Sequence, residues 1–432
     1  MKITTSYAVE ILHINKMFRK TIKIYQDAVS FCIEKLEMRW PELKELDKLR
    51  RIQYADMLLH STDDNDAMYD FDKKFPKMPS YLRRSVIQES IGALSSYHTR
   101  LEQWEETNKT SGRPFLQKRL HVLPVFYKDN MYKENLSKNE AQLKVFINND
   151  WNWITIKLKP TDIKYIKVHC TGKMSVPILE RKNKKWFLRF SFDENVKLNT
   201  KNLEEQRILA VDLGINTDAT CSVMTKNGAI LGRKFINFAN DKDQIYRTLN
   251  KIKKVQKRYG SHNTKKLWRY ATMRNNELSR KISKAIVDYA IEQDCDIIVF
   301  EHLDTKGKKC GSKKQKLHLW RKNTIQNIVT GKSHKCGIRI SRICAWGTSK
   351  LAFDGSGKVE RCKSNYSICK FPNGKQYNCD LSASYNIGAR YFIRAIEKTM
   401  NANSWSDIVA KVPECQKRTN CTYSTLLRIN AA

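Results

Sequence analysis

Two short apolar segments, each with a carboxylate at or near its end, are the feature that most constrains how this chain folds. Residues 207–213 read RILAVDL and residues 296–301 read DIIVFE, so Asp212 and Glu301 follow runs of apolar residues. Runs of this length and composition are typical of buried strands. Segments with helical spacing lie between and after them. The pattern therefore indicates an α/β arrangement from residue 206 onward.

A third acid stands in a comparable position. Asp380 precedes residues 381–392, whose apolar spacing predicts a helix that begins at the acid. For any one of the three acids, a simple cap or salt bridge is a sufficient explanation. Three carboxylates that converge on one point would repel one another, however, and would need a cation between them. Oxygen ligands favour Mg²⁺ or Mn²⁺ and are typical of two-metal phosphodiester hydrolysis.

The chain carries a large excess of positive charge. Its 432 residues include 80 Lys and Arg against 44 Asp and Glu, a formal net charge of +36. An excess of this size favours a nucleic-acid partner, because each neutralised phosphate releases condensed counterions. A Lys- and Gly-rich loop at residues 306–316 is expected close to phosphates.

Residues 251–270 combine dense basic residues with interleaved aromatic ones, which is typical of a groove that holds a nucleic-acid backbone. A solvated charged helix face is the alternative interpretation. The candidate nucleic-acid contacts are Lys253, Lys254, Lys257, Arg258, Lys265, Lys266, Trp268 and Arg269.

The N-terminal half alternates between strand and helix patterns. Residues 3–12 predict a strand and residues 14–106 a small helical lobe. Further strands are predicted at 122–127, 143–147, 153–157, 163–169 and 186–192. Because the lone first strand needs partners, we expect it to pair with the later strands, with the helical lobe inserted into that β-rich domain. No segment has the length and apolarity of a membrane span, and the first residues lack a signal-peptide pattern, so we expect a protein that stays inside the cell.

Three segments resemble the motifs of the TnpB nucleases of insertion-sequence transposons and of their descendants, the compact type V CRISPR effectors. Residues 208–223 (ILAVDLGINTDATCSV) resemble the first RuvC motif, residues 297–303 (IIVFEHL) the second and residues 380–387 (DLSASYNI) the third. The resemblance implies an RNase H-like RuvC nuclease domain in which Asp212, Glu301 and Asp380 are the catalytic acids and bind two Mg²⁺ ions, with Mn²⁺ possible. It also implies a guide RNA that selects target DNA by base pairing next to a short flanking motif.

The same resemblance suggests how the chain is divided. We expect a wedge-like, β-barrel-like domain at residues 1–13 and 113–203 and an inserted helical recognition lobe at 14–112. The RuvC domain would span 204–343 and 378–400, with an insertion at 344–377 and a C-terminal tail at 401–432. A prokaryotic cytoplasmic location follows, with nucleoid association when DNA is bound. A transposon-derived or a CRISPR-derived guide, and a monomer or a homodimer on that guide, all fit the resemblance.

Two other functions compete with a guided nuclease. One is an RNA-guided DNA-binding protein that represses or marks targets without efficient cleavage. Such relatives commonly lose one of the three acids, whereas this chain keeps all of them. The other is an unguided transposase or junction resolvase on the same fold. The charge excess and the additional N-terminal lobes disfavour that alternative.

The chain departs from the family between the second and third acids. The family usually carries two Cys-x-x-Cys knuckles that bind zinc, the first just after a Thr-Ser pair. Here Thr348-Ser349 is followed by residues 350–357 (KLAFDGSG), which contain no cysteine. We therefore expect zinc to be absent and turns at 353–357 and 372–374 to form a metal-free hairpin. If zinc were present, the ligands would be Cys344, Cys362, Cys369 and Cys379.

Overall fold

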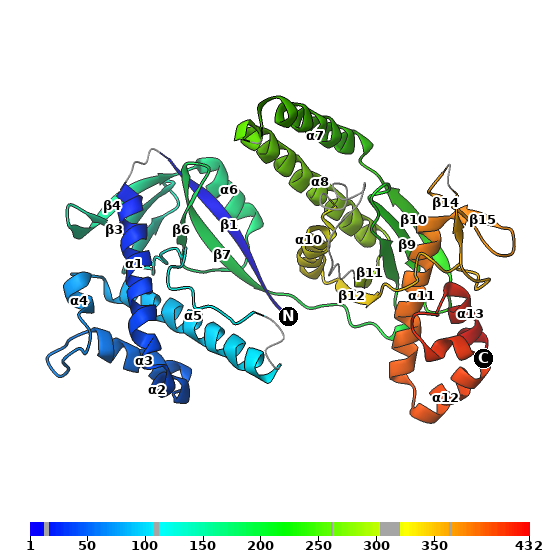
Figure 1. The fold of residues 1–432 in the computed structure, drawn as a ribbon, viewed down its shortest axis with the longest axis horizontal. Helices are drawn as coiled ribbons and strands as arrows, with labels where there is room; N and C mark the ends of the chain where they lie inside the picture. The colour runs from blue at the N-terminus through cyan, green and yellow to red at the C-terminus, as the bar shows by residue number, and fades with distance from the viewer. Residues whose placement is uncertain (13–16, 108–111, 261, 303–319, 363–364) are drawn as a thin grey trace. The chain divides into compact units, whose positions relative to one another are not determined.

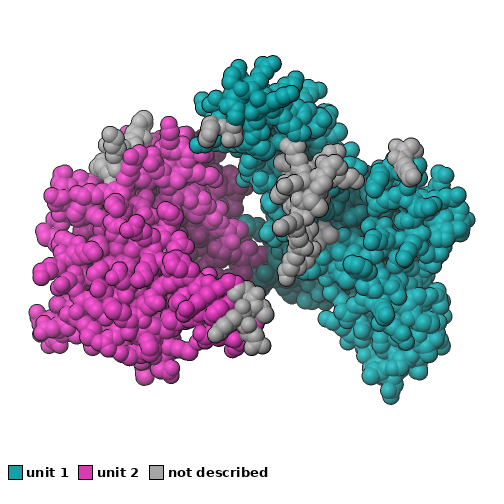
Figure 2. All heavy atoms as spheres, in the orientation of Figure 1, with its two compact units in different colours: residues 1, 196–432 teal, residues 2–195 magenta. Residues whose placement is uncertain are grey.

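The computed structural model describes the whole chain except residues 13–16, 108–111, 261, 303–319 and 363–364 (Figure 1). Contacts divide it into an N-terminal unit, residues 2–195, and a C-terminal unit, residue 1 with 196–432, shown in magenta and teal in Figure 2. Helices and strands occur in both units, in agreement with the predicted α/β class. No described helix has the length and apolar composition needed to span a membrane. The domain boundary expected between residues 13 and 14 and the basic loop expected at 306–316 lie outside the described residues.

The N-terminal unit contains one sheet and several helices. Its strands are β1 (Lys2–Leu12), β2 (Tyr132–Asn135), β3 (Glu140–Ile147), β4 (Asp150–Leu158), β5 (Lys173–Met174), β6 (Ile178–Lys182) and β7 (Lys185–Asn195). Its helices are α1 (Met17–Glu37), α2 (Trp40–Glu45), α3 (Lys48–Leu59), α4 (Phe71–Lys74), α5 (Ser80–Glu106) and α6 (Pro160–His169).

The first strand lies in the middle of this sheet, as its need for partners predicted. The strand order is β2-β3-β4-β1-β7-β5, with β6 also paired to β7, and β1 runs antiparallel to both β4 and β7. Among the described strands no ladder joins β2 to β5, so this path stays open. Val9 on β1, Val29 on α1 and Leu188 on β7 belong to one buried cluster. The helices and the sheet therefore share a core.

Two predicted strands of this unit are wrong. Residues 163–169 belong to helix α6, because Pro160 suits the first helical turn and the buried Ile163 and Ile166 are three residues apart, on one helix face. Residues 122–127 form only an isolated bridge, between Val125 and Ile178. Pro124 interrupts that segment, since it has no N–H to contribute to a ladder.

The C-terminal unit is built on a five-stranded sheet of order β10-β9-β8-β11-β12. Strands β8, β11 and β12 are parallel, whereas β9 and β10 are antiparallel to their neighbours. The strands are β8 (Ile208–Asp212), β9 (Ala219–Met224), β10 (Ile230–Ile236), β11 (Ile297–His302) and β12 (Arg339–Cys344). The helices are α7 (Ala239–Tyr259), α8 (Lys265–Glu292), α10 (Lys322–Lys335), α11 (Cys379–Thr399), α12 (Ala402–Lys411) and α13 (Tyr423–Ala431), with 3-10 turns at Leu203–Glu205, His262–Thr264 and Pro413–Gln416.

Both faces of the central strands are buried. On β8, Leu209 and Val211 join the apolar cluster formed with α7, α8 and α10. Ile208 and Ala210 join a second cluster formed with α11, α12 and α13. Because successive side chains of a strand point to opposite faces, a strand covered on both sides is apolar throughout. This arrangement explains the uninterrupted apolar runs in the sequence.

Two regions follow the large sheet. A small antiparallel sheet consists of β13 (Glu360–Arg361), β14 (Ile368–Lys370) and β15 (Gln376–Asn378), with turns at 353–356 and 372–374 close to the predicted positions. Residues 401–432, expected as a tail, instead form α12 and α13, and α13 packs against α11. Leu426 and Ile429 of α13 are buried.

Candidate active site

The fold brings the three predicted acids to one edge of the large sheet. Asp212 is the last residue of β8, and Glu301 lies near the end of the neighbouring parallel strand β11. Because Val211 pairs with Phe300, the next residues along the two strands, Asp212 and Glu301, are neighbours. Asp380 is the second residue of α11, which packs on both strands. The start of this helix is fixed by Asn378, whose side chain accepts a hydrogen bond from the backbone N–H of Leu381 at 2.9 Å.

Asp212 has the most unfavourable environment for a negative charge. Burial raises its carboxyl pKa well above the usual value, and the negative charges of Glu301 and Asp380 raise it further. The positive charge of Arg361 partly opposes this shift. The ionised form therefore needs additional positive charge nearby.

Glu301 is 8% exposed and is held by a hydrogen bond. Burial raises its pKa, while a hydrogen bond from the hydroxyl of Thr348 and the positive charges of Arg390 and Lys322 lower it, with a net upward shift. Thr348 is itself fixed, because its backbone carbonyl accepts a hydrogen bond from Nδ2 of Asn386 on α11 at 3.0 Å. The orientation of Glu301 thus depends on residues that follow it by 47 and 85 positions.

Asp380 contacts the loop that follows β8. Burial raises its pKa, and a hydrogen bond with the side chain of Thr217 and the charge of Arg361 oppose the shift. The loop turns tightly at Gly214, where an added Cβ would lie 2.5 Å from the backbone oxygen of Thr217. Glycine is therefore required there for the loop to bring Thr217 to Asp380.

The donor chemistry of this site fits a hard divalent cation. Three carboxylates supply oxygen ligands only, and the repulsion around Asp212 is the condition that a bound cation would relieve. Within the described part of the chain, no three or more His, Cys, Asp or Glu side chains are arranged as a ready coordination site. The three carboxylates would have to turn toward one another to share an ion.

Arg390 ties the surrounding segments together. Its side chain is 4% exposed and donates hydrogen bonds to four backbone carbonyls. The acceptors are Cys344 at 2.9 Å, Trp346 at 2.7 Å, Thr419 at 2.7 Å and Cys421 at 3.0 Å. It thereby joins α11 to the end of β12 and to the loop before α13.

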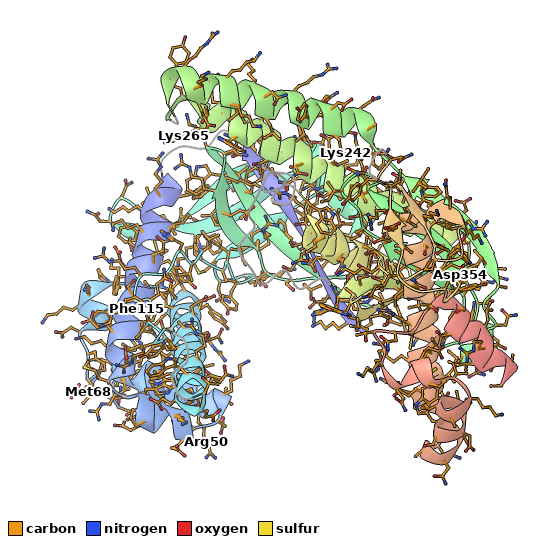
Figure 3. The ribbon with its side chains drawn as sticks, turned by 45° about the vertical axis from the view of Figure 1, so that its right-hand side comes forward. Arg50, Met68, Phe115, Lys242, Lys265 and Asp354 are labelled. Carbon is orange, nitrogen blue, oxygen red and sulfur yellow. The ribbon has the colours of Figure 1, made fainter. Side chains whose placement is uncertain are left out.

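The predicted nucleic-acid contacts are all exposed. They lie on α7 and α8, which form a helical hairpin that breaks at Gly260, with a φ of 72° (Figure 1). Figure 3 shows Lys242 and Lys265 near the two ends of this hairpin. The exposed residues are Lys253, Lys254, Lys257, Arg258, Lys265, Lys266, Trp268 and Arg269.

Among the described residues, the four candidate zinc ligands do not gather into one metal-binding group. Cys369 and Cys379 are buried with Phe371 in a small core beneath the β13–β15 sheet. Cys344 and Cys362 are exposed.

Sequence reasoning missed several residues that hold the site. In the sequence, Thr348 stands out only as half of the Thr-Ser pair that precedes a missing knuckle, and Arg390 only as one residue of the helix predicted at 381–392. An arginine within an otherwise apolar helix is a usable signal, because such a residue is rarely buried without several partners. Thr217 and Arg361 carry no comparable signal, since their roles arise from the chain's return to the sheet edge.

Comparison with known proteins gives partial matches. The Aq_aa04 family matches residues 5–147. No curated protein matches the chain. The chain is similar to Cas12f1 in a complex with sgRNA and target DNA, at 14% identity over 89% of this chain and 99% of that chain, with a TM-score of 0.47.

Two further solved structures are similar to the chain. CasPhi-2 (Cas12j) bound to crRNA shares 10% identity over 89% of this chain and 97% of that chain, with a TM-score of 0.45. C2c1 of Alicyclobacillus acidoterrestris in complex with single-guide RNA shares 10% identity over 87% of this chain and 69% of that chain, with a TM-score of 0.44. These are type V CRISPR effectors, the class that the three sequence motifs resemble.

Proposed function

We propose that this chain is an RNA-guided DNA endonuclease that hydrolyses phosphodiester bonds at a RuvC-type site. The observation that carries the proposal is the convergence of Asp212, Glu301 and Asp380 on one sheet edge, where burial and then the charges of the other two acids raise the pKa of Asp212. The sheet order supports it as well. An antiparallel β10-β9-β8 ribbon followed by parallel β11 and β12 is the arrangement expected of an RNase H-like domain.

The residues around the three acids have distinct roles in this proposal. Asp212, Glu301 and Asp380 would hold two Mg²⁺ ions, which when bound supply an activated water and stabilise charge on the leaving oxygen. Thr348 orients Glu301, and Thr217 orients Asp380. The charges of Arg361 and Arg390 offset part of the negative charge of the acids.

The basic hairpin supports the nucleic-acid part of the proposal. Eight exposed residues of α7 and α8 would contact a phosphate backbone, and the net charge of +36 favours such a polyanion as a partner. The resemblance to guided nucleases then assigns target choice to a guide RNA, with the protein holding the duplex by its backbone and shape.

The second candidate is a guided DNA-binding protein that does not cut efficiently. The retention of all three acids, each with a hydrogen-bonding or charged neighbour, favours the nuclease.

Cleavage by the purified ribonucleoprotein decides between these functions. The RNA that copurifies with the protein is sequenced, and a plasmid that carries the matching target is incubated with the complex in Mg²⁺ or Mn²⁺. We expect cutting by the wild type, none by Asp212→Ala or Glu301→Ala, and similar target binding by all three. Asp288→Ala, which removes an exposed acid of α8 paired with Lys284, is the matched control and should cut normally.

Each alternative result has a definite meaning. Cutting by either site variant removes that residue from the mechanism. Target binding by the wild type without cutting in either metal establishes the non-cutting function instead.

A further inference from the structure

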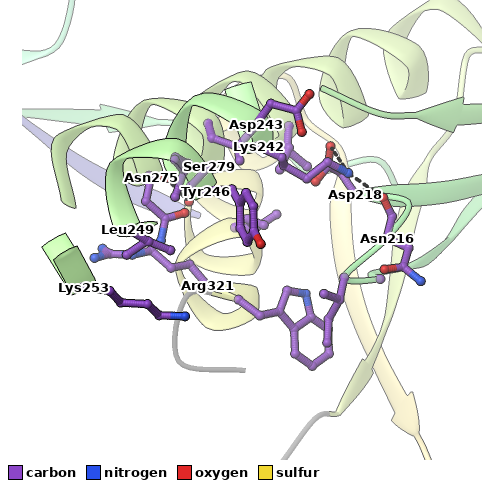
Figure 4. A pocket seen from close by; sticks show the side chains of 17 residues that line it. Asn216, Asp218, Lys242, Asp243, Tyr246, Leu249, Lys253, Asn275, Ser279 and Arg321 are labelled. Carbon is purple, nitrogen blue, oxygen red and sulfur yellow. Dashed lines mark hydrogen bonds and ion pairs between the residues drawn. The ribbon is translucent and has the colours of Figure 1, made fainter. Parts of the chain in front are cut away.

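A cavity of about 530 Å³ lies beside the candidate active site in the C-terminal unit (Figure 4). Its walls come from the loop after β8, from α7 and α8, and from the residues that precede α10. The loop supplies Gly214 and Asn216 to the lining. The same stretch of chain begins at Asp212 and ends at Thr217, whose side chain forms a hydrogen bond with Asp380. The cavity and the three carboxylates therefore share one loop, although none of the carboxylates lines the cavity.

The lining combines aromatic rings with an apolar floor. Tyr246 on α7 is 58% exposed, although it lines the cavity. Figure 4 shows its side chain projecting into the space among Lys253, Arg321 and Asn216. Leu249 and Ile282 contribute buried apolar surface to the same lining. Apolar surface beside an exposed aromatic ring is the environment that a nucleobase prefers.

Trp320 adds an unused hydrogen-bond donor. Its indole Nε1 is buried and has no hydrogen-bond partner among the described residues. A buried donor without an acceptor costs about 1–3 kcal/mol, so such a group usually has a partner in the functional state. Trp320 lines the same cavity as Tyr246, and because its Nε1 is buried, the indole has to turn toward the space before an acceptor atom of a bound molecule can satisfy it.

The charges of the lining favour a phosphate at one end. Lys253 forms no ion pair with any described residue, and Arg321 donates to the side-chain oxygen of Asn276. Lys242 is neutralised by Asp218 at 3.4 Å. The remaining acid, Asp243, lies on the other side of Tyr246 from Lys253 (Figure 4). Positive charge is therefore unbalanced at the end formed by Lys253 and Arg321, and the exposed Lys254 and Lys257 extend it along α7.

We propose that this cavity binds one unpaired nucleotide of the DNA strand that is cut. Its base lies against Tyr246, an acceptor atom of the nucleotide takes the hydrogen of Trp320 Nε1, and its phosphate faces Lys253 and Arg321. The inference rests on the proposed nuclease function, because the shared loop places this nucleotide next to the phosphate at the carboxylates. Binding in the cavity would hold the strand unpaired and in register for cleavage.

Photocrosslinking without divalent metal tests this site separately from cleavage. The full-length protein in chelator is mixed with a single-stranded oligodeoxynucleotide roughly ten nucleotides long that contains 5-iodouracil. Mass spectrometry then locates the crosslinked residue. We expect Tyr246 or Trp320 to be crosslinked, both in the wild type and in Asp212→Ala.

Affinity for the same oligonucleotide, measured by fluorescence anisotropy, provides a second readout. Tyr246→Ala should raise the Kd about tenfold, the effect of losing one stacked base. Tyr246→Phe should keep wild-type affinity, because it keeps the ring. Phe235→Ala is the matched control, since Phe235 is a half-exposed aromatic residue of the same unit on β10, outside the cavity, and it should bind like the wild type.

Three outcomes would overturn the assignment. One is an unchanged Kd for Tyr246→Ala, and another is crosslinking confined to residues outside the cavity. The third is crosslinking in the cavity by the oligoribonucleotide of the same sequence but not by DNA, which would assign the cavity to an RNA strand. If the wild type does not cut the plasmid but is still crosslinked in the cavity, the nuclease function is contradicted and the nucleotide site stands.

Discussion

The hydroxyl of Thr348 donates a hydrogen bond to Oε1 of Glu301, and both side chains are buried. Glu301 lies on β11, whereas Thr348 lies beyond the end of β12, where Asn386 of α11 holds its carbonyl. The carboxylate is therefore oriented by parts of the chain that no local pattern connects.

Replacing Thr348 by Val removes this hydrogen bond while keeping the size of the side chain. A hydrogen bond to a charged group contributes about 1.5–3 kcal/mol, so we expect the cleavage rate to fall about tenfold or more. The pKa of Glu301 should rise further, because the bond from Thr348 lowers it, and the acidic limb of the rate profile should shift to higher pH. Thr348→Ser retains the donor and should cut at nearly the wild-type rate. A Val variant with the wild-type rate and pH profile would show that the bond has no part in positioning Glu301.

Asp212→Asn should stabilise the metal-free protein. The pKa values of Asp212, Glu301 and Asp380 are raised in the folded state, so the folded protein holds protons that the unfolded chain releases. Ionisation of these groups therefore lowers the free energy of unfolding as pH rises from about 4. The neutral amide of the Asn side chain removes the contribution of Asp212, which is the largest share of that loss. The gain in Tm over wild type, measured in chelator, should be small near pH 4 and larger near pH 8.

Mg²⁺ should reverse this difference in Tm, because the bound cation compensates the negative charges of the carboxylates. The wild type should gain Tm in Mg²⁺ at the higher pH, and Asp212→Asn should gain less. Equal Tm values for the two proteins at every pH would contradict the electrostatic description of the site.

Arg390→Met should destabilise the C-terminal unit strongly. The change leaves four buried carbonyl oxygens without their shared donor, and each such group costs about 1–3 kcal/mol. Urea denaturation should show a loss of several kcal/mol in the free energy of unfolding. Arg428→Met removes an exposed arginine paired with Glu414 and should cost at most about 1 kcal/mol. Comparable midpoints for the two variants would show that Arg390 does not hold the segments together.

Zinc analysis of the purified protein should find well under one equivalent. The two buried cysteines, Cys369 and Cys379, pack with Phe371 in a small apolar core, and the other two candidates are exposed. Cys369→Ser should therefore leave the metal content unchanged. A full equivalent of zinc that is lost in this variant would reverse the prediction.

The sequence alone determined the elements whose physical signal is local. The uninterrupted apolar runs before Asp212 and Glu301 predicted buried strands, and the structure confirms them and covers them on both faces. Local patterns gave a wrong prediction where the spacing of apolar residues is compatible with both a strand and a helix. The segment 163–169 contains apolar residues that suit a strand, but Pro160 and the three-residue spacing of Ile163 and Ile166 produce a helix.

Only the tertiary structure decided which distant groups surround each acid. The sequence alone shows that the first two carboxylates each stand at the end of a strand, because the apolar residues before each are recognisable as a buried strand. It does not show that Thr348, Arg390 and Thr217 return to that edge, since the register of β8 with β11 and the packing of α11 select these neighbours. The cavity beside the site has the same origin, because its walls come from segments between residues 214 and 325 that meet only after the sheet and its helices have assembled.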